Sequence, residues 1–223
     1  MADITIKGIF KNMSTIAAPL FKGKTYPWEV LSEISDFIMT LGSTLPADEF
    51  DHPSEDVWIA KDASVAPTAY IAGPCIIDHE AEIRHCAFIR GSAIIGKHAV
   101  VGNSTEIKND ILFDYVQAPH YNYVGDSILG YKSHMGAGSI TSNLKSDRTL
   151  IVVKNDGVLI ETGRKKIGAV LGDCVEIGCG TILNPGSIVG PLSRVYPLSS
   201  VRGVVPADSI YKHEGEIARV RHD

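Results

Sequence analysis

Two basic residues and one histidine are the parts of this 223-residue chain whose type and spacing could do chemistry. Arg90 and Lys108 stand 18 residues apart. If the fold brings them together, the two cations repel each other unless an anion lies between them, which predicts a phosphate or carboxylate ligand. The alternative is a surface salt bridge with a residue such as Glu106, which stabilises little. His120 ends the stretch Gln117-Ala118-Pro119-His120, where it either caps a loop or exposes an imidazole that titrates near neutral pH.

The element that must position these residues is a six-residue repeat, each unit led by an aliphatic residue and carrying a small residue four positions later. A second block begins at Tyr123, Leu129 and Met135, and a third runs from Leu171 to Val201. The leading residues of the first block are Ile59, Val65, Ile71, Ile77, Ile83, Ile89, Ile95, Val101 and Ile107.

A period of six fits neither an amphipathic helix nor an ordinary strand. It fits a three-sided prism in which three units form one coil of about 18 residues and equivalent residues stack about 4.8 Å apart. Arg90 and Lys108 then lie one coil apart on the same edge. Glycines such as Gly96 and Gly102, which follow a leading aliphatic residue, permit tight corners. An irregular sandwich rich in isoleucine and glycine is the alternative.

Three segments interrupt or flank the prism, which is expected over residues 57–206. Residues 1–56 form an N-terminal helical cap segment, with a helix from about Pro27 to Leu41 over the open end of the prism. Residues 109–122 predict a loop that projects from a corner. The turn sequence at residues 155–157 predicts a hairpin insertion at about 144–166. Residues 207–223 form a polar, weakly helical C-terminal tail.

The composition excludes several classes of protein. A net charge of -5 and a pI near 5.9 leave no basic stripe for nucleic acid. No window approaches 18 uninterrupted apolar residues, so we expect neither export nor membrane insertion. The four cysteines form no disulfide framework or paired metal motif, which predicts reduced thiols and a cytoplasmic location.

Residues 90–143 also carry a specific resemblance. Their segments Arg-Gly-Ser, Val-Gly-Asn-Ser-Thr-Glu-Ile-Lys, His-Tyr-Asn-Tyr-Val-Gly-Asp and Met-Gly-Ala-Gly-Ser-Ile-Thr-Ser-Asn resemble the C-terminal acetyltransferase domain of the bifunctional N-acetylglucosamine-1-phosphate uridyltransferase. Residues 161–169 resemble related sugar-1-phosphate nucleotidyltransferases. The nucleotidyltransferase domain of those enzymes has no counterpart before Ile59, so we expect no pyrophosphorylase activity.

This resemblance implies an all-β, left-handed parallel β-helix that assembles as a homotrimer. It also implies an acyl-CoA-dependent N-acetyltransferase that uses acetyl-CoA as co-substrate and acts on a phosphorylated or nucleotide-linked amino sugar. In the resembled family a histidine takes the proton of the attacking amine, and His120 occupies the matching position. An imidazole can do this at neutral pH and contributes about 10² to 10⁴ in rate.

The remaining site residues are implied by matching positions. Arg90 and Lys108 match cations that hold the acceptor's phosphate, and Tyr123, which also leads a repeat unit and could be core, matches a tyrosine near the acceptor. Three positions depart from the family: His134 replaces Asn, Cys179 replaces Ser and Pro197 replaces Ala. The resemblance assigns acceptor binding to Arg90, Lys108, Tyr123, His134 and Asn143, and cofactor binding to Ala137, Cys179, Pro197 and Lys212, with Arg219 and Arg221 as further basic candidates.

Two other functions compete with this hypothesis. The departures at His134 and Cys179 favour a catalytically inactive homologue that binds sugar phosphates or acts as a scaffold. A metal-dependent carbonic anhydrase is the third hypothesis, because trimeric prisms of this kind also carry zinc. However, His79 and His85 are six residues apart and therefore fall on adjacent faces, so we expect no metal site.

Overall fold

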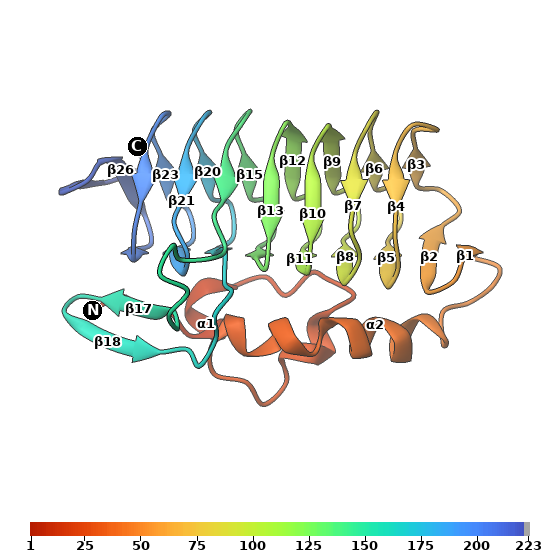
Figure 1. Ribbon diagram of the computed structural model, residues 1–223, viewed down its shortest axis with the longest axis horizontal. Helices are drawn as coiled ribbons and strands as arrows, with labels where there is room; N and C mark the ends of the chain where they lie inside the picture. Colours follow the sequence, from red (N-terminus) through yellow and green to blue (C-terminus); the bar gives the residue numbers. More distant parts are fainter. Residues whose placement is uncertain (221–223) are drawn as a thin grey trace.

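The computed structural model describes residues 1–220, which form a parallel β-helix with three flat sheets, each continued by one strand per coil (Figure 1). The chain passes from sheet A to sheet B to sheet C in a left-handed sense, as predicted. Sheet A contains β1 (Phe50–Ser54), β2 (Val57–Ala60), β5 (Cys75–Ile77), β8 (Ala93–Ile95), β11 (Asp110–Leu112), β14 (Ile128–Leu129), β19 (Ala169–Leu171), β22 (Ser187–Val189) and β25 (Val204–Val205).

Sheets B and C complete the prism. Sheet B contains β3 (Ser64–Val65), β6 (Glu82–Ile83), β9 (Val100–Asn103), β12 (Gln117–His120), β15 (His134–Met135), β20 (Glu176–Ile177), β23 (Arg194–Val195), β26 (Ser209–His213) and β27 (Glu216–Arg219). Sheet C contains β4 (Tyr70–Ile71), β7 (Phe88–Ile89), β10 (Glu106–Lys108), β13 (Tyr123–Gly125), β16 (Ile140–Thr141), β21 (Ile182–Leu183) and β24 (Ser200–Val201). We call the three edges the A–B, B–C and C–A corners.

The leading aliphatic residues fill the interior, as the repeat predicted. Ile89, Ile95 and Ile107 are fully buried, and each such side chain stabilises the fold by about 1.5 to 3 kcal/mol. Gly102 is small for a different reason from the one expected. A Cβ added there would lie 1.5 Å from the carbonyl oxygen of Pro119 in the next coil, so close approach of two backbones, not corner geometry, excludes a side chain.

The expected projecting loop at residues 109–122 is wrong. Ile89 pairs with Ile107, a coil of 18 residues, but Ile107 pairs with Val124, a coil of 17. The coil lost one residue at the C–A corner and remained regular, with β11 and β12 inside the segment. Val124 therefore points inward and is buried, and Tyr123 faces outward instead of belonging to the core.

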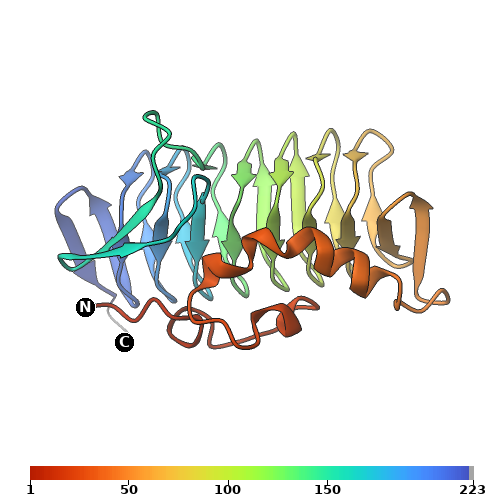
Figure 2. The same cartoon turned by 60° about the horizontal axis from the view of Figure 1, so that its bottom comes forward.

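The N-terminal segment lies along the side of sheet A and does not cover the open end of the prism (Figure 2). Its elements are α1 (Ile6–Ile9), the 3-10 helices at Ala18–Phe21 and Pro27–Ser32, and α2 (Ile34–Gly42), which packs on β5 and β8. The expected single helix at 27–41 is thus broken at Glu33. Sheet A needs this cover because its strands are apolar at consecutive positions, as in Cys75-Ile76-Ile77, so both faces are buried.

A hairpin of β17 (Val152–Asn155) and β18 (Val158–Glu161) leaves the prism after β16, as predicted. Its turn is fastened to the N-terminus. The amino group of Met1 lies 3.0 Å from Oδ2 of Asp156, and Asn155 exchanges two hydrogen bonds with the backbone of Ala2. The expected weakly helical tail is wrong, because β26 and β27 pair antiparallel and extend sheet B.

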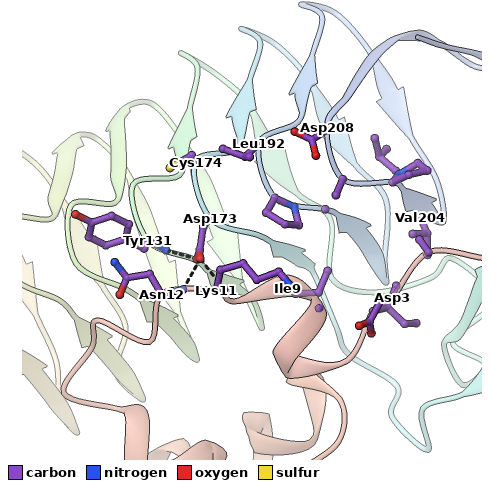
Figure 3. Close-up of a pocket in the computed structure, with 18 residues that line it drawn as sticks. Asp3, Ile9, Lys11, Asn12, Tyr131, Asp173, Cys174, Leu192, Val204 and Asp208 are labelled. Carbon is purple, nitrogen blue, oxygen red and sulfur yellow. Dashed lines mark hydrogen bonds between the residues drawn. The ribbon is translucent and has the colours of Figure 1, made fainter. Parts of the chain in front are cut away.

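Asp173 fixes the N-terminal segment to the A–B corner (Figure 3). Its Oδ2 accepts the backbone N–H groups of Lys11 and Asn12, both at 2.7 Å, and its Oδ1 accepts that of Tyr131 at 3.1 Å. A cavity of about 610 Å³ lies beside it, between this segment and the last coils. None of the sequence-predicted site residues lines that cavity. No helix within residues 1–220 is long and apolar enough to span a membrane.

Candidate functional site

Four predicted site residues form one column along the B–C corner. Backbone N–H groups of Gly138, Gly180 and Leu198 donate to the carbonyl oxygens of His120, Ala137 and Cys179 in turn, at 2.9 Å each. This parallel register stacks His120, Ala137, Cys179 and Pro197 in successive coils. His120 ends β12, and its side chain is exposed. The corner therefore presents an accessible imidazole above a continuous backbone ridge.

A second group gathers at the opposite edge of sheet C. Lys108 pairs in register with Gly125, and the N–H of Arg90 donates to Ile107, so Arg90 and Lys108 stack one coil apart at the C–A corner. Tyr123 faces outward on the neighbouring strand, and its hydroxyl accepts a hydrogen bond from Nδ2 of Asn143 at 3.2 Å. The structure thus brings together Arg90, Lys108, Tyr123 and Asn143.

Each of the two cations already has a carboxylate partner. Nη1 of Arg90 lies 2.7 Å from Oε1 of Glu106, the salt bridge that the sequence left as the alternative. Nζ of Lys108 lies 3.1 Å from Oδ1 of Asp126. The Arg90 pair is substantially exposed, so it contributes little to stability. An anionic ligand would therefore compete with these carboxylates for the cations.

Asp126 organises the cluster and was missed by the sequence analysis. Its side chain is only 4% exposed, and it accepts hydrogen bonds from the side chains of Lys108, Asn109 and Asn143. Glu106 was considered only as a salt-bridge partner, but it pairs in register with Tyr123 and shares the outer face of sheet C. A polar residue at a shortened, buried corner was the signal for Asp126.

Burial controls the ionisation of two groups beneath this cluster. It raises the pKa of the Tyr123 phenol, and the carboxylates of Asp110, Asp126 and Glu106 raise it further. Burial also raises the pKa of Asp110 well above the ordinary value for aspartate, although its carboxylate accepts the backbone N–H groups of Lys108 and Ser127. Tyr123 therefore keeps its proton and can donate a hydrogen bond to a ligand.

The remaining predicted residues lie on sheet B, outside both groups. His134 is on β15, and its Nδ1 lies 2.9 Å from Oε2 of Glu176. Lys212 is on β26 and pairs with Glu216 at 2.6 Å. Arg219 is on β27, and Arg221 lies outside the described residues. In this chain, sheet B lies around the B–C corner from the outer face of sheet C.

The histidines considered for a metal do not converge. Nδ1 of His79 lies 3.0 Å from Oδ1 of Asp62, whereas Nδ1 of His85 lies 2.7 Å from the hydroxyl of Thr68. Within residues 1–220, no group of three or more His, Cys, Asp or Glu side chains could hold a metal ion. The arrangement of sheet C instead suits an elongated polar ligand with an anionic end at Arg90 and Lys108.

Comparison with known proteins identifies relatives of this chain. A family model described as the GMPPB C-terminal domain matches residues 71–196. The bifunctional protein GlmU of Methanococcus maripaludis is 41% identical over 88 residues, 40% of this chain and 21% of that protein. The bifunctional sugar-1-phosphate nucleotidylyltransferase/acetyltransferase of Sulfurisphaera tokodaii is 33% identical over 109 residues, 49% of this chain and 27% of that protein. The chain matches less than a third of the length of either relative.

Among solved structures, perosamine N-acetyltransferase from Caulobacter crescentus, in complex with CoA and GDP-perosamine, is similar with a TM-score of 0.38 and 16% identity. That similarity covers 75% of this chain and 57% of the Caulobacter protein.

Proposed function

The chain belongs to the GMPPB C-terminal domain family, and on this premise we propose that it is an acyl-CoA-dependent N-acetyltransferase acting on a phosphorylated or nucleotide-linked amino sugar. The observation that carries the proposal is the outer face of sheet C, which has an exposed histidine at one edge and two stacked cations at the other. Relatives whose names include acetyltransferase activity on sugars support the same chemistry.

The spacing of these groups matches such an acceptor. The strands of sheet C that carry the site are three residues wide, roughly 7 Å between their end residues at about 3.3 Å per residue. His120 lies just beyond one end and Lys108 at the other. A hexose phosphate lying across the strands can place its amine near the imidazole and its phosphate near Arg90 and Lys108, with Glu106 and Tyr123 beneath the ring.

The proposed reaction needs one proton transfer and one acyl transfer. The amine nitrogen attacks the thioester carbonyl carbon of acetyl-CoA while Nδ1 or Nε2 of His120 accepts the amine proton. The C–N amide bond forms, the C–S bond breaks, and the CoA thiolate leaves with a proton returned from the imidazolium. The backbone ridge at Ala137, Cys179 and Pro197 provides the surface along which the cofactor would lie.

We further propose a homotrimer in the cytoplasm. Two neighbouring aromatic side chains on the outer face of sheet C, Tyr70 and Phe88, are 63% and 40% exposed, which favours a partner surface there. The four cysteines are all unpaired, as expected in a reducing compartment. Light scattering should give three times the chain mass of 24.0 kDa; a stable monomer at micromolar concentration would contradict the assembly.

The direct test of function is turnover. Purified protein is mixed with acetyl-CoA and a panel of amino sugars that includes glucosamine 1-phosphate and nucleotide-linked amino sugars. We expect free thiol and N-acetylated sugar to appear in equal amounts with at least one acceptor. Binding of a sugar phosphate without turnover across the whole panel would instead identify an inactive homologue.

A further inference from the structure

The hairpin insertion encloses a second polar cavity, separate from the outer face of sheet C. The cavity has a volume of about 240 Å³ and lies between β17 and the C–A corner of the last coils. Three cations, Lys145, Lys154 and Arg202, line it together with Asn184. No acidic residue lines it. This concentration of positive charge contrasts with the net charge of -5 of the whole chain.

The cavity is built into the backbone and is not a chance grouping of surface side chains. Gly186 and Gly203 both adopt positive φ, +78° and +75°. A Cβ added at Gly186 would lie 2.6 Å from Cγ2 of Ile151, and one at Gly203 would lie 3.1 Å from the carbonyl oxygen of Lys154. The two glycines therefore let the hairpin pack directly on the corner, which fixes the backbone of Lys154 beside that of Arg202.

The charges in this cavity are incompletely neutralised. Nζ of Lys145 lies 3.4 Å from Oδ2 of Asp147 and donates a hydrogen bond to the hydroxyl of Thr149. Within residues 1–220, no salt bridge or side-chain hydrogen bond involves Lys154 or Arg202. This differs from Arg90 and Lys108, each of which holds a carboxylate. Two cations held side by side without a counter-charge favour an anionic ligand.

We propose that this cavity binds the phosphate or diphosphate group of a nucleotide ligand. A guanidinium and two ammonium groups match the negative oxygens of such a group, and Nδ2 of Asn184 is already used by Ser200 and Val201, which leaves its Oδ1 as an acceptor for a ligand hydroxyl. Complete small-molecule pockets usually enclose about 300 to 1,000 Å³. The cavity therefore holds the charged group, and the remainder of the ligand extends over the surface.

Register relates this cavity to the first site. Backbone pairing places Lys108, Gly125, Ser142, Asn184 and Arg202 in successive coils of one column. Arg202 lies four coils from Lys108, about 19 Å at about 4.8 Å per coil. The diphosphate can come from coenzyme A, extended along this edge, or from a separate nucleotide sugar. Both sources share the same recognition chemistry, and binding here does not require the proposed acetyl transfer.

Calorimetric titration with inorganic pyrophosphate at low ionic strength tests the proposal. We compare the wild-type protein with the double variant Lys154→Gln/Arg202→Gln. The matched control is Arg194→Gln, which removes an exposed arginine from the outer face of sheet B. The double variant should raise the Kd for pyrophosphate at least tenfold, whereas the control should leave it unchanged. Equal binding by the wild-type protein and the double variant, or no binding by either, would overturn the proposal.

Two further titrations distinguish the ligand sources. Displacement of pyrophosphate by coenzyme A identifies the cofactor, and displacement by a nucleotide sugar identifies a separate nucleotide. Thermal unfolding of each variant confirms that the hairpin remains folded, and the single variant Arg202→Gln provides the comparison if the double variant unfolds. Pyrophosphate binding that depends on Lys154 and Arg202 without any acetyl transfer would refute the proposed function and leave this site intact.

Discussion

At the scale of single residues, the chemistry depends on the exposed imidazole of His120. Removing it in His120→Ala should lower kcat about 10²- to 10⁴-fold, because the amine loses the base that takes its proton. The KM for the amino sugar should change little. His98→Ala is the matched control, since it removes an imidazole that pairs with Glu80 at the A–B corner. Steady-state thiol release measures both, and equal losses in the two variants would contradict the assignment.

Arg90 should act on the phosphate and not on the chemical step. The substitution Arg90→Gln removes a charged hydrogen bond worth about 1.5 to 3 kcal/mol, so the KM for a phosphorylated acceptor should rise roughly tenfold or more. Unphosphorylated acceptors should show no such change. Arg84→Gln removes a similar ion pair with Glu82 on sheet B and serves as the control. A matching rise in KM for both kinds of acceptor would contradict phosphate recognition.

The buried carboxyl of Asp110 makes stability depend on pH. Burial raises its pKa in the folded protein, while the unfolded chain releases the proton near the ordinary value of about 3.9. The folded state therefore binds more protons between these two values, and its stability falls as the pH rises through that window. Asp110→Asn removes this loss. Its melting temperature relative to the wild type should rise with increasing pH above about 4.

Asp147 provides the opposite case for the same experiment. Hydrogen bonds from the backbone N–H and hydroxyl of Thr149 lower the pKa of this exposed carboxyl, so its ionised form favours folding above the unfolded value. Relative to the wild type, Asp147→Asn should therefore become less stable as the pH rises. Melting curves from pH 3.5 to 8 measure both differences, and slopes of the same sign in the two variants would contradict the role of burial.

At the scale of elements, α2 is held by the side chains it buries against sheet A. Ile38 is fully buried, whereas its neighbour Met39 is 39% exposed. Ile38→Ala should lower the free energy of unfolding by about 2 to 5 kcal/mol because it leaves a cavity. Met39→Ala should change it by about 0.5 kcal/mol or less. Chemical denaturation measures both, and equal effects would show that α2 does not cover the sheet as described.

The sequence allowed the elements of the prism to be predicted better than their surroundings. Each unit buries an aliphatic residue by itself, so the six-residue repeat specifies the coils locally. The change from 18 to 17 residues per coil at Ile107 gave no local signal, because corner residues such as Asn109 are polar in either register. The place of the N-terminal segment was readable in principle from apolar triplets such as Ala93-Ile94-Ile95, which require cover on both faces.

At the scale of the whole molecule, the sites separate by the edge of the prism on which they lie. The register of equivalent residues put His120, Ala137, Cys179 and Pro197 on one corner, which sequence spacing alone could predict for residues in regular coils. Contacts across coils were not predictable. The pairing of Lys108 with Asp126, and of His134 with Glu176, depends on side-chain directions that periodicity does not specify.

The central claim is that an amino sugar lies across the outer face of sheet C, between the B–C and C–A corners. A crystal structure of the protein with coenzyme A and an amino sugar phosphate tests this most directly. The account predicts the sugar amine within hydrogen-bonding distance of the imidazole of His120, and the phosphate on Arg90 and Lys108 in place of Glu106 or Asp126. A sugar phosphate bound elsewhere, with sheet C buried against another chain and no ligand over Tyr123, would contradict it.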